Sequence, residues 1–205
     1  MALTIRPADI IKAKVIDYLI KSFEGVVIGD EIMYGINRKI VDLLALHEGE
    51  TFAIEIKSSK DDLRRLPEQI ADYSKIFDHT LVFTTKEHLS KISELAKAKV
   101  SVFEVSEVGG IEGSILNHTN KPTKSEMLAT IKSSYIRKRL NISNAKDSDA
   151  VRKKAMKYSK DEIHALLYGY FMDKLYAPYE LFLKERKDRT EIDDINLLSN
   201  RLNVE

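Results

Sequence analysis

An acid and a base lie two residues apart in the apolar segment 52–57, FAIEIK. Side chains alternate across a β-strand, so Phe52, Ile54 and Ile56 are predicted on one face, toward the core. Glu55 and Lys57 then share the opposite face and point to the same place. The segment therefore predicts a candidate catalytic pair on a central strand.

A second carboxylate, Asp42, is the only charge inside the apolar run 40–46. A lone carboxylate in a buried strand is costly unless it is compensated. The intervening segment 47–50, HEGE, predicts a two-residue hairpin turn with Glu-Gly at its centre. Antiparallel counting from that turn puts Asp42 directly opposite Glu55. Because like charges at facing positions destabilise a sheet, the sequence predicts a compensating cation.

Lys57 can neutralise part of this charge, and a divalent cation can neutralise the rest. Carboxylates, a strand carbonyl and water suit a hard, oxygen-preferring ion such as Mg²⁺, for which Mn²⁺ can substitute. The chain has no cysteine, and its five histidines show no paired spacing, so zinc is not expected. The alternative is a buried ion network of Asp42, Lys57 and Glu55 that has no function.

Hydrophobic spacing predicts the elements that hold these residues. A helix is expected from Pro7 to Phe23, with a buried stripe through Ile10, Ile11, Lys14, Val15, Tyr18 and Leu19. Strands are expected at 26–33, 39–46, 51–57, 81–83 and 100–105, and helices at 67–77 and 86–97. Gly109, Gly110 and Gly113 indicate a turn. This order predicts an α/β core with a mixed sheet rather than a βαβ repeat.

The pattern changes after Pro122, where no strand signal remains. One helix is expected around 127–136 and another around 163–175, with a polar loop at 141–150 between them. We therefore expect a core at 1–118 and a helical, basic region at 119–205. Residues 121–160 hold 12 Lys and Arg against 3 Asp and Glu, although the whole chain has a net charge of +1.

This positive segment is a candidate surface for a polyanion, and the alternative is a solvated helical face. The cluster Arg137, Lys138 and Arg139 is expected to contact this polyanion. A rival interpretation has the C-terminal region bind a protein partner or a second copy of the chain. The residues expected at that interface are Leu166, Leu167, Tyr170, Phe171 and Leu175.

Asp42 followed by Glu55-Ile56-Lys57 resembles the PD-(D/E)XK nuclease superfamily, which has the restriction-endonuclease-like fold. Downstream, the segment 69–73, QIADY, resembles the Q-x-x-x-Y motif of RecB-type nucleases. The string 55–78, EIKSSKDDLRRLPEQIADYSKIFD, resembles a small family of uncharacterised prokaryotic and phage proteins. The superfamily has Pro before the Asp, and this chain has Val41.

The resemblance implies an αβββαβ core with a mixed central sheet, which a C-terminal helical region follows here. It implies that Asp42, Glu55 and the carbonyl of Ile56 hold Mg²⁺, with Glu31 as a further ligand. Lys57 would orient the attacking water or stabilise developing negative charge. For Glu31, the alternative is a surface glutamate at a strand end.

Gln69 and Tyr73 lie one helical turn apart and so share a helix face. The resemblance implies that this face lies over the site and touches substrate or Lys57. The alternative for Tyr73 is a core aromatic residue.

The expected function is therefore a Mg²⁺-dependent endo- or exodeoxyribonuclease that acts in repair, recombination, restriction or phage biology. Two alternatives are a catalytically silent DNA-binding or scaffold protein of the same fold and a Holliday-junction resolvase, whose archaeal members act as dimers. The expected partner is nucleic acid, most simply DNA, and a homo-oligomer is compatible with the sequence. No apolar run reaches membrane-spanning length and no secretory signal is visible, so a cytoplasmic location is expected.

Overall fold

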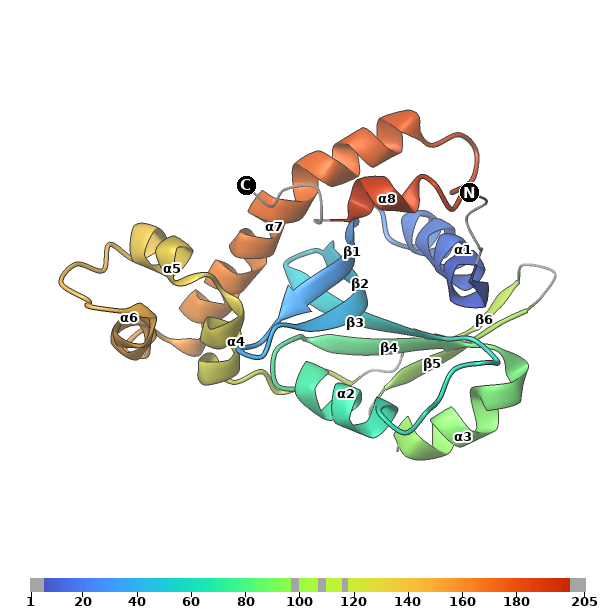
Figure 1. The fold of residues 1–205 in the computed structure, drawn as a ribbon, viewed down its shortest axis with the longest axis horizontal. Helices are drawn as coiled ribbons and strands as arrows, with labels where there is room; N and C mark the ends of the chain where they lie inside the picture. The colour runs from blue at the N-terminus through green and yellow to red at the C-terminus, as the bar shows by residue number, and fades with distance from the viewer. Residues whose placement is uncertain (1–5, 97–99, 107–109, 116–117, 200–205) are drawn as a thin grey trace.

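The computed structural model describes residues 6–96, 100–106, 110–115 and 118–199, which form an α/β fold around a six-stranded mixed sheet (Figure 1). The strands are β1 (Val27–Tyr34), β2 (Lys39–His47), β3 (Glu50–Lys57), β4 (His79–Thr84), β5 (Ser101–Val105) and β6 (Ile111–Gly113). The helices of the first half are α1 (Pro7–Ser22), α2 (Leu66–Tyr73) and α3 (Lys86–Ala96). Those of the second half are α4 (Lys124–Thr130), α5 (Ser133–Arg139), α6 (Ser148–Ala155), α7 (Lys160–Glu185) and α8 (Ile195–Leu198).

The strands lie in the sheet in the order in which the chain makes them. β1, β2 and β3 are antiparallel neighbours, β3, β4 and β5 are parallel, and β6 is antiparallel to β5. Each parallel step needs a crossover, and α2 and α3 supply these two connections. Figure 1 shows α1 on one side of the sheet and α2 with α3 on the other.

The predicted order of helix, three strands, helix, strand, helix and strand is confirmed. The strand β6 was missed, because it has only three residues, one of them Gly113, and the glycines of this segment indicate a turn. The helix predicted at 67–77 ends earlier, at Tyr73. The predicted helix end at Lys97 and the predicted turn residue Gly109 lie outside the described residues.

The single helix predicted around 127–136 is in fact two helices, α4 and α5. They separate at Ile131 and Lys132, whose ψ angles of 137° and 131° are extended rather than helical. The loop predicted at 141–150 is shorter, because Asp147 caps α6 by accepting a hydrogen bond from the backbone N–H of Ala150.

The hairpin predicted at 47–50 is confirmed. Glu48 and Gly49 have φ angles of +48° and +85°, and a type I′ turn requires positive φ at both central residues. His47 pairs with Glu50, and the same register continues to the pair Leu43 and Ile54. One further step places Asp42 across from Glu55, as the sequence predicts.

The sequence places Phe52, Ile54 and Ile56 on the core face of β3, and the structure shows that the opposite face is buried as well. All residues of β3 from Thr51 to Lys57 are buried, including Glu55 and Lys57. The reason is that β3 is central in the sheet: α1 contacts one of its faces, and α2 covers the other with residues that reach Glu55. The charged pair therefore lies between the sheet and α2 rather than at an open surface.

The C-terminal helices pack on the same hydrophobic core as the sheet, and α7 crosses β1 (Figure 1). The approach is close: a side chain at Gly29 of β1 would meet the Cδ2 atom of Leu175 at 2.6 Å. The residues that the rival interpretation placed at a partner interface are buried in this core and so do not form an exposed interface: Leu166, Leu167, Tyr170, Phe171 and Leu175. Among the helices of the described segments, none has the length and apolarity that crossing a membrane would need.

Candidate active site

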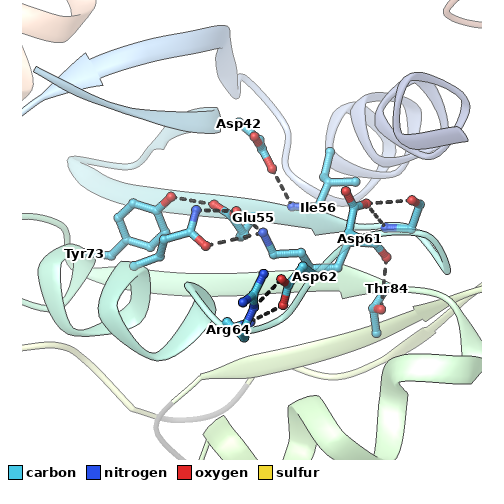
Figure 2. A network of polar contacts seen from close by, with 11 residues as sticks. Asp42, Glu55, Ile56, Asp61, Asp62, Arg64, Tyr73 and Thr84 are labelled. Carbon is cyan, nitrogen blue, oxygen red and sulfur yellow. Dashed lines mark hydrogen bonds and ion pairs between the residues drawn. The ribbon is translucent and has the colours of Figure 1, made fainter. Parts of the chain in front are cut away.

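Asp42 lies one residue before Leu43, which pairs with Ile54 at the end of the ladder between β2 and β3. Its Oδ2 atom accepts a hydrogen bond from the backbone N–H of Ile56, at 2.8 Å, so a side chain takes the place of a ladder bond (Figure 2). This contact fixes the Asp42 carboxylate beside the middle of β3. Its other oxygen, Oδ1, accepts no hydrogen bond from the part of the chain that the structure describes.

Glu55 is 2% exposed, and three side chains donate hydrogen bonds to its carboxylate. Lys57 Nζ lies 2.7 Å from Oε1, and Gln69 Nε2 lies 2.6 Å from the same oxygen. The hydroxyl of Tyr73 donates to Oε2 (Figure 2). Gln69 and Tyr73 share a helix face, as their spacing predicts, and both contact Glu55 from α2; Gln69 also lies 3.3 Å from Lys57 Nζ, a contact that the resemblance implies. The Tyr73 ring is also part of the core, so both interpretations of this residue hold.

The two carboxylates of the site carry more negative charge than the nearby cations compensate. Burial and the charge of Glu55 together raise the pKa of Asp42 to about 7, against the opposing effects of the Ile56 hydrogen bond, Lys12 and Lys57. Burial, with the charge of Glu55, also raises the pKa of Tyr73 far above its usual value, so Tyr73 stays a protonated donor at neutral pH. Two carboxylates that repel each other in a buried site favour a bound cation.

The structure adds a buried ion pair that sequence reasoning missed. Lys12 of α1 is 6% exposed and its Nζ lies 2.6 Å from Oδ1 of Asp30, which is 5% exposed. The predicted stripe of α1 was displaced: Ile10 is exposed, and the buried face contains Lys12. A lysine within the helical spacing 11, 12, 15, 16 and 19 was the available signal for a buried charge.

Contacts of the loop after β3 and of β4 fix the backbone around Lys57. Oδ2 of Asp61 accepts hydrogen bonds from the backbone N–H of Ser58 at 2.7 Å and from its hydroxyl at 2.6 Å. The hydroxyl of Thr84 on β4 donates to the carbonyl of Lys57 at 3.0 Å (Figure 2). Because both flanking contacts are to buried or half-buried groups, the Lys57 side chain starts from a fixed backbone position.

A cleft of about 520 Å³ opens beside Lys57. It is lined by Lys57, Asp61, Asp62, Arg64, Arg65 and Gln69. Arg64 is engaged by Asp62, whereas Arg65 is exposed and makes no ion pair within the described residues. The cleft therefore reaches Lys57 and Gln69, which both contact Glu55, and Arg65 is the cation of its lining that makes no ion pair within the described residues.

Glu31 remains a prediction as a metal ligand. In the register of β1 and β2 it falls across from Asp42, between the pairs of Asp30 with Leu43 and Ile32 with Val41. Its φ angle of +50° departs from strand geometry. Within the described residues, no three or more His, Cys, Asp or Glu side chains lie together in a way that could hold a metal. The donor set that the structure does assemble, Asp42 with Glu55, is chemically suited to a hard cation.

The three basic residues expected to contact DNA have different surroundings. Arg137 donates to the carbonyl of Ala145 at 3.0 Å and so holds the loop before α6. Arg139 pairs with Asp173 of α7 at 2.6 Å. Lys138 is exposed. Two of the three therefore have an intramolecular role, and DNA contact by this cluster stays a prediction.

Comparison with known proteins places the chain in a family. The family model of bacteriophage P4 protein cII matches residues 1–199. The chain belongs to the bacteriophage P4 protein cII family. No curated protein matches it. Among solved structures, it is similar to a protein of unknown function from Silicibacter pomeroyi, at 20% sequence identity and a TM-score of 0.45, over 68% of this chain and 92% of that one.

Proposed function

We propose that this member of the P4 cII family is a metal-dependent nuclease that hydrolyses phosphodiester bonds, with DNA as its substrate. The observation that carries the proposal is the placement of Asp42 and Glu55 on adjacent strands, with Lys57 in contact with Glu55. A network that served stability alone would balance its charges. Here the pKa of Asp42 is raised to about 7 by burial and by Glu55, which supports a site that takes a further positive charge.

Asp42 and Glu55 are the residues that would hold Mg²⁺ or Mn²⁺, with the Ile56 carbonyl and Glu31 as the further predicted ligands. When bound, the ion would supply Lewis-acid polarisation of the scissile phosphate and acidify a water molecule.

The roles of the other residues follow from their contacts. Lys57 Nζ lies within 3.3 Å of Gln69 Oε1 and 2.7 Å of Glu55 Oε1, so its charge is held at the mouth of the cleft, where it would stabilise charge that develops on the phosphate. Gln69 orients both Lys57 and Glu55. Tyr73 keeps a neutral hydroxyl against Glu55 and so fixes the direction of that carboxylate. Arg65 is the residue of the cleft best placed to hold the substrate backbone.

The order of the elements supports a restriction-endonuclease-like core. α1, β1, β2, β3, α2 and β4 give the succession αβββαβ, with β1–β3 antiparallel and β4 parallel to β3. The two carboxylates lie on the hairpin of β2 and β3, where the resemblance expects them.

A second candidate is a catalytically silent DNA-binding or scaffold protein of the same fold. It is favoured by one observation: both oxygens of Glu55 already accept hydrogen bonds, from Lys57, Gln69 and Tyr73. In this alternative the buried network is structural and divalent ions are not bound.

Nicking of supercoiled plasmid distinguishes the two candidates. We expect the wild type to nick with Mg²⁺ or Mn²⁺ and not with EDTA, and Asp42→Asn to be inactive. Lys57→Ala should lower the rate about 100- to 1000-fold, or about 3–4 kcal/mol, with little change in DNA affinity. Glu180→Gln and Lys21→Ala are matched controls, because they alter an exposed carboxylate on α7 and an exposed lysine on α1.

Single-stranded, duplex, flapped and four-way DNA should be tested alongside the plasmid, since preference for the four-way form would indicate the resolvase alternative. If neither ion supports cleavage of any of these substrates and neither raises the melting temperature, the nuclease proposal is wrong. The silent DNA-binding protein then remains. An ion present at 100 times its Kd would add about 2.7 kcal/mol to the free energy of unfolding.

A further inference from the structure

A second cavity, of about 380 Å³, lies between the turn that joins β1 to β2 and the helices α4, α5 and α6. Its lining combines three cationic side chains with hydroxyl groups. The residues that the argument uses are Arg38, Thr130, Lys132, Ser133, Ser148 and Arg152. We call this cavity the basic pocket.

The positive charges of the basic pocket have few anionic partners. Neither Arg38 nor Lys132 makes an ion pair in the described part of the chain, and both are exposed. Arg152 has one carboxylate nearby, Asp149 at 3.5 Å, whose side chain is 90% exposed. A fourth cationic side chain, the half-buried Lys174 of α7, lies close by: burial lowers its pKa, and the charges of Lys132 and Arg38 lower it further.

The pocket is held together by hydrogen bonds that tie its parts to one another. The hydroxyl of Thr130 on α4 accepts from the N–H of Gly35 in the β1–β2 turn, at 3.1 Å, and donates to the carbonyl of Glu126. Nε of Arg152 donates to the carbonyl of Leu128, at 3.1 Å.

On the opposite wall, the hydroxyls of Ser133 and Ser148 lie 2.9 Å apart and join α5 to α6. The cations therefore gather at a built cavity rather than on independent surface side chains.

Arg38 occupies the pocket at a conformational cost. Its φ angle is +53°, in the left-handed region that asparagine and glycine adopt more readily than arginine. An asparagine at this position would fit the turn at least as well and would remove the charge. Arg38→Asn therefore separates the effect of the charge from any effect on folding.

We propose that the basic pocket binds a phosphate group of the nucleic-acid backbone, outside the candidate active site. This inference deepens the proposed nuclease function and rests on it, since it names where the substrate is held. Arg38 precedes Asp42 by four residues, so their Cα atoms are at most about 14 Å apart. That span corresponds to about four base-pair steps of duplex. A backbone that reaches Asp42 can thus place another phosphate in the basic pocket.

The basic pocket differs from the cluster Arg137, Lys138 and Arg139 in the contacts that its charged side chains already make. Two of those three side chains are bound to Ala145 and Asp173, whereas Arg38 and Lys132 have no such partner in the segments described. A phosphate can pair with Arg38 and Lys132 without breaking an existing contact. We therefore assign the contact with the nucleic-acid backbone to the basic pocket.

The test measures binding of duplex DNA to the full chain across a salt series, by fluorescence anisotropy in EDTA so that no cleavage occurs. We expect the double variant Arg38→Asn/Lys132→Gln to bind more weakly and to flatten the slope of log affinity against log salt by roughly one unit. Arg38→Asn alone should not lower the melting temperature. The control Lys21→Gln/Lys91→Gln removes the same charge from α1 and α3, at the other end of the molecule (Figure 1), and should leave the slope unchanged.

A slope that does not change in the double variant, or that changes equally in the control, overturns the pocket assignment. The assignment is also overturned if the wild-type pocket binds inorganic phosphate but the slope of log DNA affinity against log salt is the same in the wild type and the double variant. If DNA is cleaved but the slope does not depend on the pocket, the nuclease proposal stands and the pocket fails. If the slope depends on the pocket but no DNA is cleaved with Mg²⁺ or Mn²⁺, the pocket stands and the nuclease proposal fails. Absence of any DNA binding by the wild type overturns both.

Discussion

The hairpin of β2 and β3 and the C-terminal helices both carry many charges, yet they use them differently. In the hairpin, Glu55 and Lys57 are buried and contact each other. In the helices, most of the positive charges lie at the surface, and several bind backbone carbonyls, as Lys124 does with Met156 and Tyr158. The count of charges in a segment therefore does not identify the residues that contact a ligand. Burial and the partners of each side chain do, because they determine which charge is uncompensated.

The largest effect that would test this comparison is expected from Glu55→Ala. The substitution leaves Lys57 as an unpaired buried charge and removes the acceptor of Tyr73. We expect a loss of about 3–5 kcal/mol in the free energy of unfolding, measured by urea denaturation. Glu180→Ala, at an exposed position, should change it little. Equal stability of the two variants would show that the buried network does not hold its charges in contact.

A change of opposite sign is expected from Asp42→Asn without divalent ions. Asparagine can still accept from the Ile56 N–H but does not repel Glu55. Because burial and Glu55 raise the pKa of Asp42 to about 7, folding of the wild type weakens as the pH rises toward that value and the carboxylate loses its proton. We expect a gain of about 1–2 kcal/mol above pH 7, which shrinks at lower pH. A loss of stability at all pH values would contradict the repulsion.

His164→Gln tests a contact of the C-terminal helices with Asp78, which also accepts hydrogen bonds from Thr51 of β3. His164 Nε2 on α7 lies 2.8 Å from Asp78 Oδ2. The hydrogen bond to Asp78 raises the pKa of His164. Burial alone would raise the pKa of Asp78, but hydrogen bonds from His164 and Thr51 hold it below its usual value.

The pH dependence of this contact follows from the raised pKa of His164 and the lowered pKa of Asp78. The contribution of protonated His164 to stability is complete below pH 6.5 and is lost as the pH rises through the folded-state pKa of His164. The contribution of ionised Asp78 to stability is lost as the pH falls below 3.8. We expect the wild type to exceed His164→Gln by about 1 kcal/mol between these limits and by less above them, in urea denaturation at several pH values. A difference that is independent of pH would rule out the ion pair as its cause.

The smallest effect is expected from Arg139→Gln, which removes a surface ion pair. The side chains of Arg139 and Asp173 are 52% and 50% exposed, so solvent screens their attraction. We expect no measurable change in the melting temperature. A clear drop would mean that the surface charges of the C-terminal helices contribute to stability as the buried charges of the hairpin do.

Much of the fold could be predicted from the sequence because the patterns that indicate it are local. Strand alternation, the Glu48-Gly49 turn and the spacing of Gln69 and Tyr73 each depend on neighbours in sequence, and each is confirmed. The break between α4 and α5 was not readable, because the sequence pattern alone did not mark the extended conformation of Ile131 and Lys132.

For the candidate site, the sequence by itself determined the positions of Asp42, Glu55 and Lys57, since a two-residue turn fixes the register of the two strands that follow from it. Only the tertiary structure decided which charges are buried and which are uncompensated. The pair of Lys12 with Asp30 and the gathering of Arg38 with Lys132 both join residues that are distant in sequence. Local patterns carry no information about such contacts, because they form only when the helices pack against the sheet and its turns.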